Sequence, residues 1–164
     1  MAVLTPSWYV IYTHPQQERK IYANLLHQNL TAYLPMQIVV RRWSDRMKQL
    51  TTPLFPNYLF VRITDRERAS VLKLAGVARF IVFEGRPAII ADEEIETIRR
   101  LEGANAEPEP GLITGDRVQV VQGPFIGLDG VLFRKMGKAR FGVRLQGLRQ
   151  TVSLDIDECL LKKV

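Results

Sequence analysis

Apolar and polar positions alternate with a period of two in some stretches of the chain and follow a helical period in others. The alternation predicts strands at 7–13, 31–43 and 53–61, and a bent strand or strand pair at 79–90. The helical period predicts helices over 16–29, 64–74 and 92–101. Beyond these, short apolar runs between glycine-containing turns predict five strands, at 117–121, 130–135, 140–145, 150–154 and 158–161.

Local signals mark the ends of several predicted elements. Pro15 suits the first turn of a helix, and Thr64-Asp65-Arg66-Glu67 is a capping box that opens another helix. Gly76 is placed to end that second helix. The polar run Ser44–Lys48 predicts a hairpin tip between two strands. Asp92-Glu93-Glu94 places negative charge where it complements the dipole at a helix start, and Ile95, Ile98 and Leu101 form the inner stripe of that helix.

The strand predicted over Pro53–Val61 is apolar on both faces. Alternation points Phe55, Leu59 and Val61 to one side, and Leu54, Tyr58 and Phe60 to the other. The helices of a small domain usually cover only one face of its sheet, so the second face needs a cover. That cover is either another part of this chain or another protein, and the pattern alone leaves both open.

These elements predict an α+β protein in two parts. Residues 7–101 form an antiparallel sheet flanked by helices, in the order β-α-β-β-α-β-α. Residues 102–111 contain two prolines and three glutamates without an apolar anchor, which predicts an extended, semi-stiff linker. The five short strands within residues 112–164 predict a small β-barrel.

The distribution of charge along the chain shows two basic parts separated by a short acidic segment. The chain of 164 residues has a net charge of +6, and residues 1–101 contribute +5, residues 102–111 contribute −3 and residues 112–164 contribute +4. A basic balance is typical of proteins that bind nucleic acids. No apolar run is long enough to span a bilayer, and Met1–Ser7 lack the features of a secretory signal. We therefore expect a cytoplasmic protein that does not enter membranes.

The sequence offers little catalytic chemistry. It has no phosphate-binding loop and no Gly-x-Ser-x-Gly elbow, and its two histidines, His14 and His27, are expected on the surface. The single cysteine, Cys159, lies in an apolar stretch and is expected to be an inert thiol in the core. We expect no enzyme activity, no cofactor and no metal site.

Two motifs carry a resemblance to a known family. The run Pro53-Leu-Phe-Pro-Asn-Tyr-Leu-Phe-Val61, preceded by Ser7-Trp-Tyr-Val-Ile-Tyr12, resembles the amino-terminal domain of the NusG family of transcription elongation factors. The run Gly115-Asp-Arg-Val-Gln-Val-Val-Gln-Gly-Pro-Phe125, followed by Gly130-Val131, resembles the KOW motif that closes these proteins. The character of the chain is closest to the specialised paralogues of the RfaH type.

The resemblance implies a factor that rides on RNA polymerase and promotes processive elongation. In this family an apolar sheet face of the first domain docks onto the clamp helices of the polymerase. The expected polymerase-binding residues are Tyr12, Leu54, Tyr58, Phe60 and Phe83. Tyrosine and phenylalanine supply large contact area at low entropic cost, which suits a protein interface. The alternative is that the helix at 92–101, or the barrel, covers this face.

Basic residues on the first helix and the hairpin are the second candidate site. They are Arg19, Lys20, His27, Arg41, Arg42, Arg46 and Lys48. Contacts from these residues to phosphates of upstream DNA or of the non-template strand would give affinity without reading sequence. The alternative is a solvated charged face.

The barrel carries the third candidate site. Family members bind a small-subunit ribosomal protein or the termination factor Rho through a Phe-Gly-Arg motif followed by Thr-Pro-Val-Glu-Leu. This chain has Gln146-Gly-Leu-Arg-Gln-Thr-Val-Ser-Leu154, so the aromatic residue and the proline are lost. Gln146, Leu148 and Arg149 are the expected contact residues, and the departures argue against Rho. The glycines and β-branched residues of this part disfavour helix, so we expect a stable barrel.

The leading hypothesis is therefore a monomeric transcription elongation and antitermination factor that binds RNA polymerase. The second hypothesis is a ribosome- or RNA-associated binding protein, since basic KOW barrels also occur in such proteins.

Overall fold

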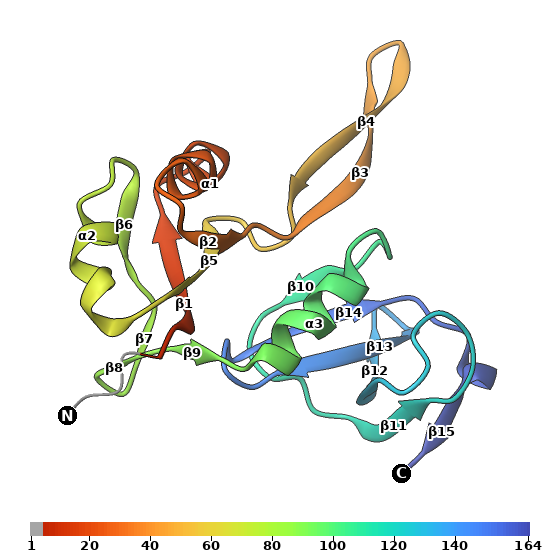
Figure 1. The fold of residues 1–164 in the computed structure, drawn as a ribbon. Helices are drawn as coiled ribbons and strands as arrows, with labels where there is room; N and C mark the ends of the chain where they lie inside the picture. The colour runs from red at the N-terminus through yellow and green to blue at the C-terminus, as the bar shows by residue number, and fades with distance from the viewer. Residues whose placement is uncertain (1–4) are drawn as a thin grey trace.

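The computed structural model describes residues 5–164 as two large antiparallel sheets with helix α3 (Asp92–Leu101) between them (Figure 1). Residues 1–4, part of the segment considered for a signal sequence, lie outside the described residues. The mixed α and β composition with antiparallel sheets agrees with the prediction. Within residues 5–164, no helix is long and apolar enough to cross a membrane.

The first sheet has the order β2 (Thr31–Tyr33), β5 (Tyr58–Ile63), β1 (Ser7–Thr13) and β6 (Val77–Phe80). A short strand, β9 (Ile89–Ile90), also pairs with β1. In the central pair, β1 and β5, Val10 lies opposite Phe60 and Tyr12 lies opposite Tyr58. This register places Tyr12, Tyr58 and Phe60 on one face of the sheet, whereas Tyr9 lies on the other face.

The opposite face of this sheet is covered by the chain's own helices. Helices α1 (Glu18–His27) and α2 (Arg68–Leu72) pack against it, and η1 (Asp65–Glu67) leads into α2. The predicted capping box is present, and the backbone N–H of Thr64 donates to Glu67 Oε1 at 3.0 Å. Leu59 and Val61 point into this core, as alternation predicts.

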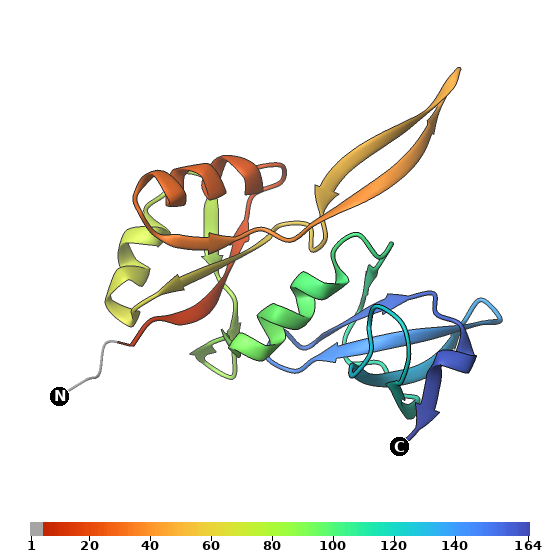
Figure 2. The ribbon, with the colours of Figure 1, turned by 45° about the vertical axis from the view of Figure 1, so that its right-hand side comes forward.

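A hairpin of β3 (Met36–Trp43) and β4 (Arg46–Pro53) forms a separate two-stranded sheet that projects from the body (Figures 1 and 2). The prediction of one continuous strand over 31–43 is wrong. The chain leaves the first sheet after Tyr33 and enters the hairpin at Met36, with Pro35 between them. Proline has no N–H to donate to a ladder, which explains a break at this point.

The strand predicted over Pro53–Val61 is also divided. Pro53 ends β4, residues 54–57 turn, and β5 begins at Tyr58. Asn57 adopts the left-handed region in this turn, at φ 70°. Because of the turn, Phe55 and Leu54 join the same cluster as Phe60, so the predicted side for Phe55 is wrong.

Two short strands, β7 (Val82–Phe83) and β8 (Arg86–Pro87), form a small hairpin beside the first sheet. Its central residues, Glu84 and Gly85, both have positive φ, as a type I′ hairpin turn requires. The hairpin places Phe83 near the face of the first sheet that carries Tyr12, Tyr58 and Phe60 (hereafter the aromatic face). Its turn agrees with the turn predicted at Glu84-Gly85-Arg86.

The second sheet has six strands in the order β10 (Glu107–Glu109), β14 (Gln150–Leu154), β13 (Lys138–Leu145), β12 (Asp129–Lys135), β11 (Asp116–Val120) and β15 (Leu161–Lys163). Strand β10 lies in the segment expected to be a linker without apolar anchors. It pairs with β14, and Ala106 beside it is buried. The strand predicted at 158–161 is instead η2 (Glu158–Leu160) followed by β15.

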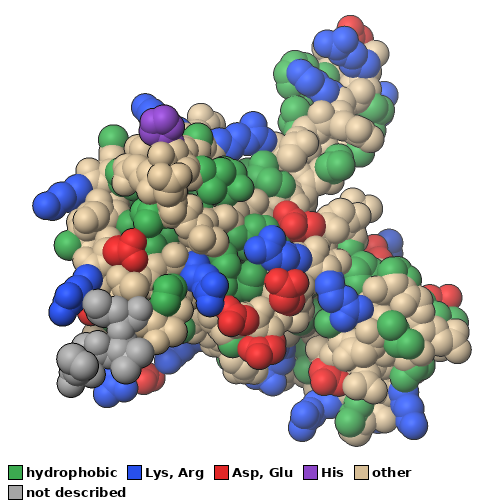
Figure 3. All heavy atoms as spheres, in the orientation of Figure 1, with side chains coloured by type: hydrophobic (Ala, Val, Ile, Leu, Met, Phe, Trp, Pro, Cys, Tyr) green, Lys and Arg blue, Asp and Glu red, His purple; other side chains and the backbone are tan. Residues whose placement is uncertain are grey.

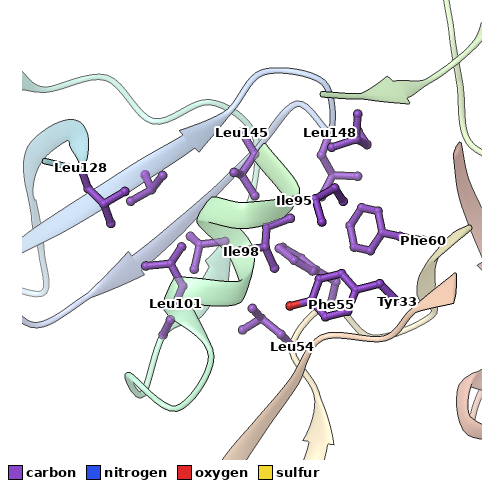
Figure 4. Packing of buried hydrophobic residues seen from close by; sticks show 14 of the residues in the cluster. Tyr33, Leu54, Phe55, Phe60, Ile95, Ile98, Leu101, Leu128, Leu145 and Leu148 are labelled. Carbon is purple, nitrogen blue, oxygen red and sulfur yellow. The ribbon is translucent and has the colours of Figure 1, made fainter. Parts of the chain in front are cut away.

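Helix α3 joins the two sheets into one apolar core. Its stripe of Ile95, Ile98 and Leu101 is fully buried, as predicted. Figure 4 shows this stripe between Phe55 and Phe60 on one side and Leu145 and Leu148 on the other. The first sheet's second face is therefore covered from within this chain.

A charged network fixes β10 to the second sheet. The Lys135 ammonium lies 2.7 Å from the carboxylate of buried Glu109 and 2.8 Å from that of Glu107. Ser153 Oγ also donates to Glu109, at 2.8 Å. Burial raises the pKa of Glu109, but the hydrogen bonds from Lys135 and Ser153 outweigh this and hold the pKa below its ordinary value of 4.5. Hydrogen bonds to Glu107 and Glu109 raise the pKa of Lys135.

Replacing Lys135 with methionine should destabilise the protein by about 2 kcal/mol at neutral pH, because the buried Glu109 carboxylate loses its ammonium partner. Glu109 contributes stability above pH 4.5, and this contribution is lost as pH falls through its lowered pKa. The gap between wild type and variant should therefore shrink in acid. Urea unfolding at several pH values measures it, with Lys138→Met on the neighbouring strand as control; equal effects of both changes would contradict the expectation.

Candidate protein-binding face and basic hairpin

Three of the five expected polymerase-binding residues are half-buried at the edge of the first sheet's second face. Tyr12 and Tyr58 are cross-strand partners, with ring centroids 5.8 Å apart in an edge-to-face arrangement. Arg79 lies over the Tyr12 ring at 4.6 Å. Phe83 reaches the same cluster from the β7–β8 hairpin. These rings combine large apolar area with polar tips, a composition typical of protein interfaces.

The other two residues are buried. Leu54 and Phe60 have no exposed surface, and the Phe60 ring stacks on Tyr33 with centroids 6.1 Å apart. Phe55 meets the Phe60 ring edge-on at 6.2 Å. The structure thus gathers all five residues in one cluster, but Leu54 and Phe60 form its floor and cannot contact a partner while α3 covers them.

A turn of the second sheet covers this face. It connects β13 to β14 and consists of Gln146–Arg149 (hereafter the docking turn). The Glu94 carboxylate on α3 accepts hydrogen bonds from the backbone N–H groups of Gln146, at 2.8 Å, and Gly147, at 3.2 Å. A Cβ atom at Gly147 would lie 3.0 Å from the carbonyl oxygen of Ile89, so a larger residue would fit only if the turn or its neighbour moved by a few tenths of an ångström.

Side chains of the docking turn complete the cover. Leu148 is buried in the shared core. Arg149 lies over the Phe83 ring at 4.4 Å and donates to the Glu84 carboxylate at 3.3 Å. An open surface pocket of about 420 Å³ lies beside this contact, lined by Tyr58, Phe83, Pro108, Glu109, Pro110, Gly111, Leu148, Arg149 and Gln150. Two of the three expected barrel-site residues, Leu148 and Arg149, therefore lie against the expected polymerase-binding residues, whereas the side chain of Gln146 is exposed.

Helix α3 is anchored to both sides. At its carboxyl end, Glu102 accepts hydrogen bonds from the Tyr33 hydroxyl and the Met36 N–H, each at 2.8 Å. Burial, together with the Glu102 carboxylate, raises the pKa of the Tyr33 phenol. Arg100 donates to the carbonyl oxygens of Pro124 and Ile126 in the second part of the chain. The helix therefore holds the two sheets in a fixed position relative to each other.

Sequence reasoning missed the acidic residues that hold the cover. The sequence relates Glu94 only to the helix dipole, and nothing in it connects Glu94 to Gly147, which is 53 positions away. The sequence predicts a turn at Glu84, as the structure has it, but gives no sign of the contact between Glu84 and Arg149. The alternating pattern indicated that the face needs a cover, but not which segment supplies it.

The expected nucleic-acid-binding residues fall into two groups. Arg41, Arg42, Arg46 and Lys48 are exposed at the outer end of the hairpin, where Figure 3 shows basic side chains gathered. Lys20 and His27 are exposed on α1. Arg19 donates from α1 to the carbonyl oxygen of Thr51, and so contacts the base of the hairpin. The structure does not bring the two groups onto one continuous site (Figures 1 and 2).

The remaining candidate reactive residues lie on the surface. His14 and His27 are exposed, as expected. Cys159 is exposed in η2, so the prediction of a core thiol is wrong. The hydrogen bond with the neighbouring Asp157 carboxylate raises the pKa of this thiol, which disfavours the reactive thiolate. Over the part of the chain that the structure describes, no group of histidine, cysteine and acidic side chains could hold a metal ion.

Comparisons with known proteins point to one family. A family model described as transcription termination factor nusG matches residues 6–99. The transcription termination/antitermination protein NusG of Lactococcus lactis is 26% identical over 167 residues, covering 92% of this chain and 90% of that protein. The protein of the same name from Halalkalibacterium halodurans is 22% identical over 175 residues, covering 96% and 98%.

A solved structure shares the fold. The structure titled "Domain interaction in Thermotoga maritima NusG" is similar with a TM-score of 0.55 and 24% sequence identity, covering 97% of each chain.

Proposed function

Because this chain belongs to the NusG family, we propose that it is a transcription elongation and antitermination factor that binds the clamp of RNA polymerase and promotes processive elongation. The first part, residues 7–101, docks through the face that carries Tyr12, Tyr58 and Phe83. Leu54 and Phe60 support these rings from below. Residues 102–111 connect this part to a KOW domain of residues 112–164.

The proposal rests on how the docking turn is held over the aromatic face. The face opposite α1 and α2 ends in half-buried rings that the docking turn covers. The turn is held there by Glu94, by the exposed Glu84–Arg149 pair and by one buried leucine, and α3 completes the cover with its buried stripe of apolar residues. Exposed ion pairs contribute little stability, so such a cover can be displaced by a partner that offers a larger apolar contact.

The closed arrangement also supports a specialised, RfaH-like role within the family. While the docking turn lies on the aromatic face, the side chains of Leu148 and Arg149 and the backbone N–H of Gln146 are engaged. Release by the polymerase would free them for a second partner. A small-subunit ribosomal protein fits this proposal better than Rho, because Gln146 replaces the aromatic residue of the family motif.

The basic hairpin extends the proposed site to nucleic acid. Its exposed cations project away from the body, where they would meet DNA near the polymerase cleft without obstructing the aromatic face. Cations at such positions contribute affinity that falls with salt and carries no sequence preference.

In vitro transcription through a long template tests the proposal. Adding the wild-type protein to purified RNA polymerase should increase the yield of full-length transcript and of read-through at terminators. Unchanged pausing and read-through, together with salt-sensitive RNA affinity of the full chain, would contradict the proposal and favour the RNA-associated alternative.

A further inference from the structure

The register of the hairpin divides its outer end into two different faces. Trp43 lies opposite Arg46, and Arg41 lies opposite Lys48. Because alternate residues of a strand point to opposite faces, these four side chains share one face. Arg42 lies opposite Met47 on the other face. The basic residues of the hairpin therefore lie on two different faces, although they are close together in the sequence.

The face with Trp43 combines an open aromatic ring with three cations. Trp43 is 47% exposed, whereas the chain's other tryptophan, Trp8, is 6% exposed in the core. The Lys48 ammonium lies 4.5 Å from the centroid of the Trp43 ring. The hairpin's single acidic residue, Asp45, lies in the turn beyond the strands. An exposed tryptophan at the end of a projecting hairpin contributes nothing to either core.

We propose that this face, with Trp43 at its centre, binds single-stranded nucleic acid. The indole ring stacks on an unpaired base, and Arg41, Arg46 and Lys48 neutralise the flanking phosphates. The inference rests on the proposed function, in which the hairpin meets nucleic acid, and adds both the strand state and the residue that recognises it. Stacking on an aromatic ring tolerates any base, and an adjacent cation strengthens it.

The chemistry of the face favours an unpaired strand over the other possible occupants. Bases of a duplex are already stacked on each other, so a duplex offers phosphates to the cations but no free ring to Trp43. A protein partner would better fit the opposite face, where the apolar side chains of Ile38, Val40 and Met47 are exposed. Four cations against one acid on the whole hairpin give the charge complementarity that a phosphodiester chain requires.

The position of this face makes it independent of the docking turn. Each strand of the hairpin has eight residues, so the outer end lies roughly 25 Å from its base at the usual rise of a strand. Figure 2 shows the hairpin extending away from α3 and the second sheet. The proposed binding therefore occurs in the closed arrangement and does not require polymerase.

Titration of the full chain with short oligonucleotides tests the proposal. The probes are oligothymidylate and oligouridylate of about 15 nucleotides and a DNA duplex of similar length. Both single strands should bind more tightly than the duplex and should quench the fluorescence of Trp43. Trp43→Ala should weaken single-strand binding by about tenfold and leave duplex binding within about twofold. A preference between the DNA and RNA strands identifies which source of unpaired bases the face takes.

Arg41→Gln and Arg42→Gln form a matched pair, since each removes one cation and only Arg41 shares the face of Trp43. Arg41→Gln should lower the dependence of binding on salt by about 0.7 in log–log slope, and Arg42→Gln should change it much less. Melting of Trp43→Ala should match wild type, because the residue lies outside both cores. Equal effects of the two arginine changes, or unchanged binding by Trp43→Ala, would overturn the proposal.

The outcomes separate this inference from the proposed function. If strands and duplex bind equally and Trp43→Ala has no effect, the stacking site is wrong, but binding of polymerase through the aromatic face is untouched. If the protein stimulates elongation only when the aromatic face is intact, while no oligonucleotide binds, the single-strand inference alone is refuted.

Discussion

Replacing both Tyr58 and Phe83 with alanine should weaken binding to RNA polymerase by about 100-fold or more. Both rings lie at the centre of the proposed contact, and aromatic side chains in such positions each contribute about 2 kcal/mol or more to binding. The change also removes the surface on which Arg149 rests, so the docking turn should be released more easily. Binding should still be lost, because an open face without its rings offers the polymerase little apolar area.

Binding of the variant to purified core polymerase, measured by anisotropy of the labelled protein, checks this expectation. Tyr22→Ala is the matched control, since Tyr22 is a partly buried ring on α1, on the opposite side of the same sheet. Phe60→Ala is unsuitable as a probe, because emptying a fully buried ring position costs about 3–5 kcal/mol of folding stability. Equal affinity of wild type and the Tyr58/Phe83 variant would contradict the proposed face.

Replacing Glu94 with alanine should have the opposite effect and strengthen polymerase binding. Glu94 accepts the hydrogen bonds of two backbone N–H groups in the docking turn, and bonds to a charged group contribute about 1.5–3 kcal/mol. Their loss should raise the population of the open form by at least tenfold. The affinity for polymerase should rise by the same factor, until the open form predominates.

Glu93→Ala is the control for this change. It removes the same charge from the same first turn of α3, where Glu93 is exposed. Any effect on the helix dipole is therefore common to both variants, and only Glu94→Ala releases the docking turn. If both variants bind polymerase as wild type does, the hydrogen bonds of Glu94 do not hold the face closed.

Local patterns predicted much of the first part because the residues that determine it are near each other in the chain. The alternation of Ser7–Thr13 gives the observed bounds of β1, and the spacing of Ile95, Ile98 and Leu101 gives the buried stripe of α3. The capping box at Thr64 and the turn at Glu84-Gly85 follow equally short-range rules.

The errors arise where a distant contact overrides the local pattern. Pro35 separates β2 from β3, because the chain passes from one sheet into another at that point. Glu107–Glu109 has the composition of a linker but becomes a strand, because Lys135 compensates the charge of its carboxylates and Ser153 donates a hydrogen bond to one of them. Cys159 precedes two leucines in the sequence, which suggested a buried strand, but it is exposed in η2.

The candidate site divides in the same way. Alternation places Tyr58 and Phe60 on one face of the sheet, because the register of two strands follows from their apolar pattern. The apolar character of that face indicates that it needs a cover. The docking turn could not be predicted, because its contacts join residues 52 to 65 positions apart through a carboxylate, a glycine and an arginine. Such pairs leave no periodic signal in a single sequence.

Measuring the distance between the two parts of the chain before and after polymerase binds tests most directly whether the docking turn covers the binding face. The only cysteine, Cys159, is exposed on the second part, and Ala23→Cys on the exposed side of α1 supplies a second label. We expect high energy transfer in the free protein and a marked fall when polymerase is added, with no fall in the Tyr58/Phe83 variant. Unchanged transfer in wild-type protein that is bound to polymerase would contradict the claim that the docking turn covers the binding face.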